Sequence, residues 1–265
     1  MRYVRIFQRF MTNSLIREMS FRMHFLSEIV GHIVWIILLL TFVGIMYGQT
    51  REIQGWSRYQ YVFLLGTHMA ITRLFETFFF SNCWRVSELV RTGNLDFVLV
   101  RPASAQFLLS LERIDYSALA NVPIALIICG YAAWNQGVEI TPIKVGLFCL
   151  LIVSGVITLY SLLFMFAITS VWMIRQTGID HLWFYAMSLA RYPADIYKPF
   201  VGGILFFVLV FVVPILMVSN LPATVMVRSF SPWMVGYVVL LSLILLAVSS
   251  VVFRYAIRAY RSASS

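Results

Sequence analysis

The chain has 265 residues, of which 61% are hydrophobic and only 12% are charged. A soluble domain is roughly half apolar and about a quarter charged, so this composition excludes an ordinary water-soluble domain. A membrane-spanning helix takes about 20 apolar residues, so the length allows roughly five to seven spans and little else. We therefore expect a single all-α integral membrane domain over residues 1–265.

The net charge of +9 comes almost entirely from arginine, with 18 Arg and 2 Lys. These arginines stand at the ends of apolar runs, where basic side chains fix membrane orientation and meet anionic lipid. No basic run stands free of an apolar segment, so we expect membrane lipid as a partner and no nucleic acid.

Residues 1–23 come first and are amphipathic. On a helix, three arginines fall within an arc of about 60° and aromatic residues fall on the opposite side. These two groups are Arg2, Arg5 and Arg9 against Tyr3, Phe7 and Phe10. The pattern predicts a helix that lies in the membrane interface. The alternative is a disordered basic tail, which the high aromatic content disfavours. The apolar run that follows is too long for a cleaved signal peptide and is expected to remain as an anchor.

Apolar runs further along the chain predict six spans, with a cytoplasmic helical segment at 84–102 between the second and the third. The fifth span has an alternative: it begins near Gly178, breaks at Tyr192-Pro193 and re-enters the outer leaflet. Residues 220–232 are expected to form a loop or re-entrant backbone. The predicted spans are 25–47, 59–80, 113–134, 143–173, 200–219 and 233–253.

The distribution of basic residues predicts the orientation. With the N-terminus inside, most Arg and Lys residues lie on the inner side, which favours both termini in the cytoplasm of a cell (inner or plasma) membrane protein. The alternative fifth span moves Arg191 and Lys198 outside and leaves the asymmetry in place. The basic residues outside are otherwise Arg51, Arg58, Lys144 and Arg228.

Motifs for chemistry within this chain are missing. A phosphate-binding loop ends in Gly-Lys-Ser/Thr, whereas Lys144 precedes Val145 and Lys198 precedes Pro199. The sequence contains neither HExxH nor GxSxG, so a polytopic membrane enzyme is the weakest alternative. The three cysteines are far apart and form no CxxC, so we expect no metal site.

The candidate functional residues among the ionisable side chains of the predicted spans are Glu28, His68, Arg73 and Glu76. Arg73 and Glu76 are three residues apart on one helical face and can pair. Charged groups in the membrane are costly, and they often mark a function. Three interpretations stay open: a buried pair that holds the second span, a substrate path, or a proton relay in an ion-coupled secondary transporter.

The segment 84–102 contains the most specific pattern. Trp84–Arg91 is expected to be a short helix with a Glu88–Arg91 pair, and Gly93 is expected to end it in a left-handed conformation. Asn94 is the predicted N-cap of a second short helix. The negative charge of Asp96 is favourable at the positive N-terminal end of that helix. The apolar residues Leu95, Phe97, Val98 and Leu99 lie beside these charges, and Pro102 ends the segment. The result is a compact helical knob suited to a groove on a partner.

This segment resembles the coupling helix of ABC-2-type transporter permeases, in which a Glu-x-x-Arg-x-Gly-x-Leu-Asp/Glu run precedes a Pro-Ala/Leu-Ser turn. Gly55-Trp56-Ser57 and Tyr192-Pro193 extend the resemblance to an uncharacterised branch of the family and over nearly the whole chain. The matching positions are Glu88, Arg91, Gly93, Leu95, Asp96 and Pro102-Ala103-Ser104.

The resemblance implies six spans, an N-terminal interfacial helix and re-entrant helices before the last span. It also implies that two permeases, identical or paralogous, pair with two copies of an ABC ATP-binding subunit that holds ATP and Mg²⁺. By this resemblance the matched positions of 84–102 contact the ATPase, no ATPase activity resides in this chain, and the assembly exports an amphipathic, drug-like or lipid-like substrate.

Overall fold

A computed structural model of the chain describes residues 2–173 and 179–260. The described residues are almost entirely helical, and a short antiparallel hairpin, β1 (Glu52–Ile53) with β2 (Trp56–Ser57), follows the second helix. The helices are α1 (Arg2–Ser20), α2 (Arg22–Gln49), α3 (Arg58–Phe75), α4 (Ser81–Arg91), α5 (Asp96–Leu99), α6 (Ala105–Leu111), α7 (Tyr116–Gln136), α8 (Pro142–Ile168), α9 (Ile179–Ala190), α10 (Ile204–Phe207), α11 (Ile215–Val227) and α12 (Pro232–Ala259).

Short turns of other helix types join several of these helices. Two of them are π-helical: η1 (Glu76–Phe80) follows α3 directly, and η5 (Val208–Val212) follows α10. The 3₁₀ turns are η2 (Thr169–Val171), η3 (Ala194–Tyr197) and η4 (Phe200–Gly203).

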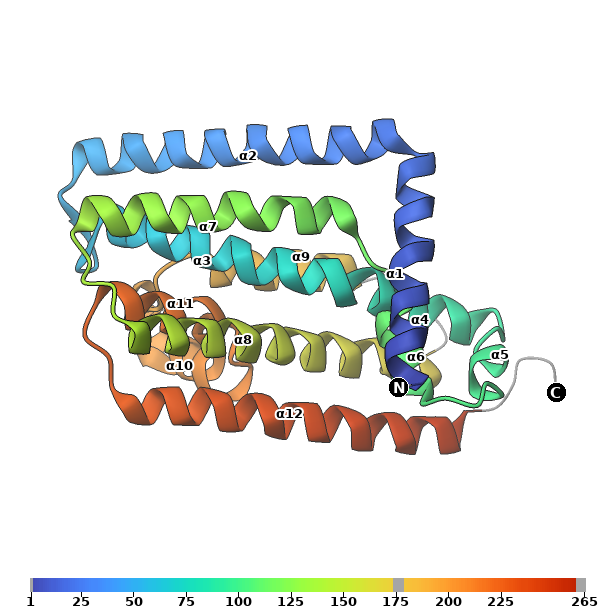
Figure 1. Cartoon of the computed structure of the whole chain (residues 1–265). Coiled ribbons are helices and arrows are strands. Elements are labelled where there is room, and N and C mark those ends of the chain that lie inside the picture. Colours follow the sequence, from blue (N-terminus) through green and yellow to red (C-terminus); the bar gives the residue numbers. More distant parts are fainter. Residues whose placement is uncertain (1, 174–178, 261–265) are drawn as a thin grey trace.

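The long helices lie side by side as a bundle, and α1 crosses one end of it (Figure 1). By length and composition α2, α7, α12 and α8 with its 3₁₀ extension are long and apolar enough to cross a membrane. They cover the predicted first, third, fourth and sixth spans, so the predicted all-α membrane fold is confirmed. Helix α7 begins at Tyr116 rather than at residue 113, because the Asp115 carboxylate accepts the backbone N–H of Ala118 and caps it.

Helix α3, which covers most of the predicted second span, lies at the centre of the bundle. Every residue from 61 to 72 is buried, and α7, α8 and α11 pack around the helix. It is not among the helices that are apolar enough to span by composition alone. The reason is that its polar residues, such as His68 and Arg73, lie within protein rather than against lipid.

The prediction of one straight fifth span over 200–219 is wrong. Residues 204–212 and 215–227 form two helical stretches bent by 83° at the break that contains Pro214, whose ring and missing N–H prevent a continuous helix. Of the two alternatives predicted for 220–232, a loop does not describe its first part, since α11 runs to Val227 with Pro222 inside it. The bend before α11 agrees with the other alternative, re-entrant backbone.

Contacts at the far end of the bundle support the alternative path. Asp195, just after α9, accepts a hydrogen bond from Trp56 Nε1 at 3.1 Å and pairs with Arg228 at 3.5 Å. The chain therefore leaves and returns to the same end of the bundle between residues 195 and 228, as a re-entrant segment does. Helix α9 ends at Ala190, and the break falls at the predicted Tyr192-Pro193.

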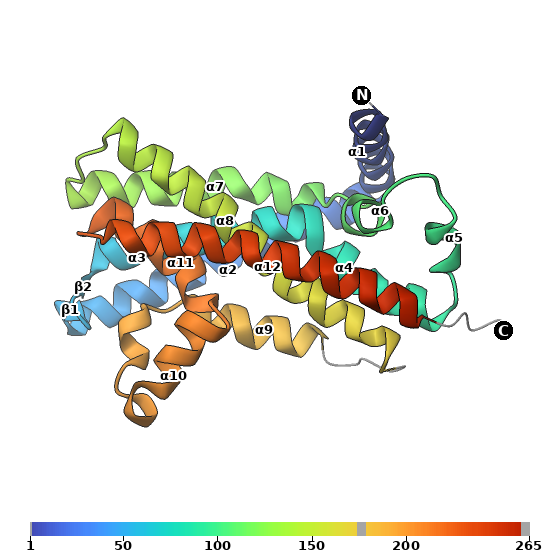
Figure 2. The same cartoon turned by 90° about the horizontal axis from the view of Figure 1, so that it is seen from below.

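The two ends of the bundle differ in what they carry. The N-terminus, α4, α5, α6 and the end of α12 gather at one end, which we call the knob end (Figures 1 and 2). The hairpin, the α7–α8 connection and the α11–α12 connection lie at the other, which we call the hairpin end (Figure 1).

Candidate functional site

The predicted coupling segment is a pair of short helices at the knob end, on the chain between α3 and α7. Helix α4 ends at Arg91, and Gly93 follows with φ +73°, a conformation that favours glycine. The backbone N–H of Leu95 then turns back to the carbonyl of Leu89 at 3.1 Å. Asn94 is not the N-cap of α5, because its amide donates instead to the Thr92 hydroxyl at 2.9 Å.

The knob, which we define as α4, α5 and the turn to Pro102, divides its apolar residues between two faces. Leu95 and Val98 are 1% and 3% exposed and pack into the core, whereas Phe97 and Val100 are 68% and 78% exposed. The expectation that Leu95 touches a partner directly is therefore corrected: it anchors the knob. The exposed apolar surface is Phe97 with Val100.

Its charged residues are accessible. Glu88 and Arg91 are both exposed, and no ion pair joins them in the part of the chain that the structure describes, so the predicted i,i+3 pair is wrong. Asp96, the first residue of α5, is partly buried and lies near Tyr260, which follows α12. Burial of the Tyr260 hydroxyl raises its pKa, and the negative charge of Asp96 raises it further.

Glu112, which sequence reasoning did not single out, holds both ends of the knob. Its carboxylate lies 2.8 Å from Arg85 of α4 and 4.0 Å from Arg101 after α5. The side chains of Arg85 and Glu112 are 22% and 24% exposed, so water screens this pair only partly. Because Glu112 comes just before α7, the pair ties the knob to the base of that helix.

Helix α1 is bonded to the chain that follows the knob. The Arg2 guanidinium donates to the Pro102 carbonyl, and the Ser104 N–H donates to the Tyr3 hydroxyl at 3.3 Å. Further along, the Ile114 N–H donates to the buried Ser14 hydroxyl at 3.0 Å. The N-terminal helix thus forms a strap, defined as α1, across the knob end.

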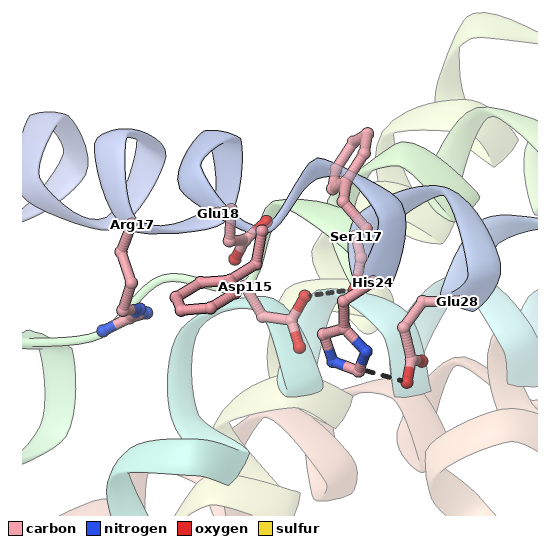
Figure 3. Close-up of a pocket in the computed structure, with 8 residues that line it drawn as sticks. Arg17, Glu18, His24, Glu28, Asp115 and Ser117 are labelled. Atoms are coloured by element: carbon pink, nitrogen blue, oxygen red, sulfur yellow. Dashed lines mark hydrogen bonds and ion pairs between the residues drawn. The ribbon is translucent and has the colours of Figure 1, made fainter.

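At the elbow between α1 and α2 there is a cavity of about 370 Å³ (Figure 3). Glu28 lies here, 3.9 Å from His24, and not beside the other three predicted intramembrane residues. Burial raises the pKa of Glu18, although its carboxylate also accepts the Tyr116 N–H at 2.9 Å, which lowers it. The elbow is thus a polar joint between the strap and α7.

The other three predicted residues meet at a second cavity of about 250 Å³ between α2, α3 and α9. His68 Nδ1 lies 3.0 Å from the Ser219 hydroxyl of α11, and Arg73 pairs with Glu76 at 2.6 Å. Two further basic residues that sequence reasoning missed line the same cavity: His32 on α2 and Arg191 after α9. The only signal for His32 was a polar residue inside an apolar run. We call this cavity the polar groove.

In residues 2–173 and 179–260, no group of three His, Cys, Asp or Glu side chains is arranged to hold a metal ion. The described residues thus form a helical bundle with several helices long and apolar enough to cross a membrane, an ionisable groove between α2, α3 and α9, and a helical knob at one end.

A sequence profile of the family described as ABC-2 family transporter protein matches residues 33–264. The chain therefore belongs to that family and is the permease of an ABC transporter. Comparison with curated proteins and with solved structures gave no match. Permeases of this family are typically non-enzymatic and generally work with an ATP-binding subunit, as the resemblance of residues 84–102 implied.

Proposed function

We propose that this permease couples ATP hydrolysis on separate subunits to the export of an amphipathic, drug-like or lipid-like substrate. Two copies of the ATP-binding subunit hold ATP and Mg²⁺, and a second permease, identical or paralogous, completes the membrane part. The observation that carries the proposal is the knob, which is anchored in the core and presents Phe97 and Val100 to its surroundings.

The knob has the features of a helix that enters a groove on a partner. Its apolar tip is flanked by the accessible charges of Glu88 and Arg91, and Gly93 and Pro102 shape the turns on either side. Aromatic anchors that fill partner pockets usually dominate such contacts. Asp96 and Leu95 act from beneath, by holding the orientation of α5.

Force applied to the knob has two routes into the membrane. Helix α3 continues through η1 into α4, so a tilt of α4 reaches the centre of the bundle. Glu112 connects the knob to α7 in parallel. We expect closure of the ATP-binding subunits to act along both routes.

The proposed orientation places the knob end and both termini in the cytoplasm of the inner or plasma membrane. The strap, the knob and the end of α12 carry nine of the 18 arginines, whereas the hairpin and the two connections at the hairpin end carry few, in agreement with the positive-inside rule. In this proposal the fifth of six crossings begins before α9 and includes it, and the re-entrant segment follows at the hairpin end. A topology reporter placed near Asn94 should report the cytoplasm; a signal from the opposite side would end the proposal.

The decisive test compares Phe97→Asp with Ile140→Asp in protein purified from its own membranes. Both side chains are exposed, at 68% and 63%, but Ile140 lies at the hairpin end. The wild type and Ile140→Asp should retain an ATP-binding subunit and its Mg²⁺-dependent ATP hydrolysis, whereas Phe97→Asp should lose both. Equal retention in the two variants would contradict docking at the knob.

The Arg73–Glu76 ion pair at the groove supports a second candidate function, that of an ion-coupled secondary transporter. In that case transport would stop when the proton or sodium gradient is dissipated at constant ATP. Our proposal expects transport to continue under those conditions.

A further inference from the structure

The polar groove contains more positive charge than the protein neutralises. Glu76 is the one carboxylate among its described lining residues, and it pairs with Arg73. Arg191 lies on the same groove without a carboxylate within ion-pair distance among the side chains that the structure describes. Its guanidinium carbon lies 5.6 Å from the centroid of the Tyr192 ring.

Two buried nitrogen atoms at this groove have no hydrogen-bond partner among the described residues. Arg191 Nε and His32 Nε2 are both shielded from solvent and unpaired, although they come from α2 and from the end of α9. A buried donor without an acceptor costs about 1–3 kcal/mol, and more if it is charged. Arg191 Nε always carries a proton, and His32 Nε2 carries one in one of its two neutral tautomers. A group with acceptor atoms in this cavity would therefore satisfy both nitrogen atoms when the His32 proton is on Nε2.

The rest of the lining is apolar and aromatic. The Trp183 ring packs on Phe75 of the core in a tilted arrangement, at 4.5 Å between ring centroids. Trp35 and Phe184, which also line the groove, are 53% and 64% exposed. Exposed aromatic rings beside a cationic pocket suit a molecule with a hydrocarbon or aromatic body.

We propose that the polar groove binds the anionic headgroup of an amphipathic substrate, a carboxylate or a phosphate, with Arg191 and His32 as its direct contacts and Trp35 and Phe184 beside its apolar body. The inference rests on the proposed transport function and specifies the substrate class. The Arg73–Glu76 pair closes one side of the groove and leaves Arg191 as the cation that the ligand neutralises.

The test uses the full chain, without ATP-binding subunits, in phosphatidylcholine nanodiscs. The probe is 9,10-dibromostearate, whose bromine atoms quench nearby tryptophan fluorescence, and the neutral probe is the corresponding alcohol. Saturable quenching by the acid should weaken about tenfold or more in Arg191→Gln, since hydrogen bonds to charged groups contribute about 1.5–3 kcal/mol. Arg191→Lys should restore part of it, and Arg258→Gln, an exposed arginine at the knob end, should bind like the wild type.

Quenching by the alcohol should be the same in the wild type and in all of these variants. Competition by oleoyl lysophosphatidic acid would assign the site to phosphate as well as carboxylate, and its failure would restrict the site to carboxylates; both results support an anion site. Equal quenching by acid and alcohol, or an unchanged affinity in Arg191→Gln, would overturn the inference. Because no ATP-binding subunit is present, that result would leave the docking test at Phe97 unaffected.

Discussion

At Gly66, α3 lies so close to α7 that adding a single methyl group tests the contact. A Cβ atom at Gly66 would lie 2.7 Å from Cys129 Sγ and 3.1 Å from both the Ala125 carbonyl oxygen and the Cys129 nitrogen. Small residues at helix crossings in membranes permit such backbone contact. In Gly66→Ala the Cys129 side chain has to shift and the two backbones have to separate by a few tenths of an ångström.

The expected magnitude follows from two opposing terms. Overpacking of a well-packed contact costs about 1–3 kcal/mol. Alanine in place of glycine inside a helix gains up to about 1 kcal/mol. Gly130→Ala is the matched control, because it lies next to Cys129 on α7 and its Cβ would meet nothing within 4 Å. The control keeps the gain without the clash, so the two variants should differ by about 1–3 kcal/mol.

Thermal unfolding of the purified full chain in a neutral detergent measures this difference. At about 2–4 °C per kcal/mol for a chain of this size, Gly66→Ala should melt about 2–12 °C below Gly130→Ala. Cys129→Ala in the Gly66→Ala background removes the sulfur contact but not the backbone contacts, so it should recover part of the loss. A Gly66→Ala protein as stable as Gly130→Ala would refute the close approach of α3 and α7.

Two further predictions concern the charged contacts at either end of the bundle. Glu112→Gln should release the knob, so that trypsin cleaves after Arg91, which is exposed at the end of α4, several-fold faster in detergent; Glu52→Gln, at the hairpin end, should not change the rate. At Asp195, burial raises the pKa, but hydrogen bonds from Lys198 and Trp56 and the charges of Lys198 and Arg228 outweigh it and bring the pKa below 3.8. The stabilisation by Asp195 is therefore present above pH about 3.8 and is lost as the pH falls through the lower folded-state pKa. On acidification from pH 5 to 3, the melting temperature should fall more in the wild type than in Asp195→Asn.

Hydropathy predicted the helices that face lipid and failed where the chain folds back. Helices α2, α7, α8 and α12 each present an apolar surface to the membrane, and their cores match the predicted spans closely. The segment from α9 to α11 is equally apolar, so composition alone could not place its bends. Its path is set by Pro214 and by contacts of Asp195 with residues more than 30 positions away, which no local pattern contains.

The knob illustrates the same division between local and distant causes. Gly93 marked the end of α4 correctly because a left-handed residue is a local requirement. Which apolar residues face outward depends on how α5 rotates against the core, and that placed Leu95 inside and Phe97 outside. Glu112 escaped notice because its partner Arg85 is 27 residues away.

The polar groove and the knob are consecutive parts of one helical run, and this continuity is what a coupled transporter needs. Arg73 lies in the last turn of α3, Glu76 opens the π-helical turn η1, and η1 passes directly into α4. A π-helical turn carries one extra residue per turn and is frequent at functional sites because it can rearrange locally. A tilt of α4 therefore acts first on the turn that holds Glu76 against Arg73. Any change in that pair alters the charge that the groove presents beside Arg191, which links the position of the knob to the affinity for an anionic ligand.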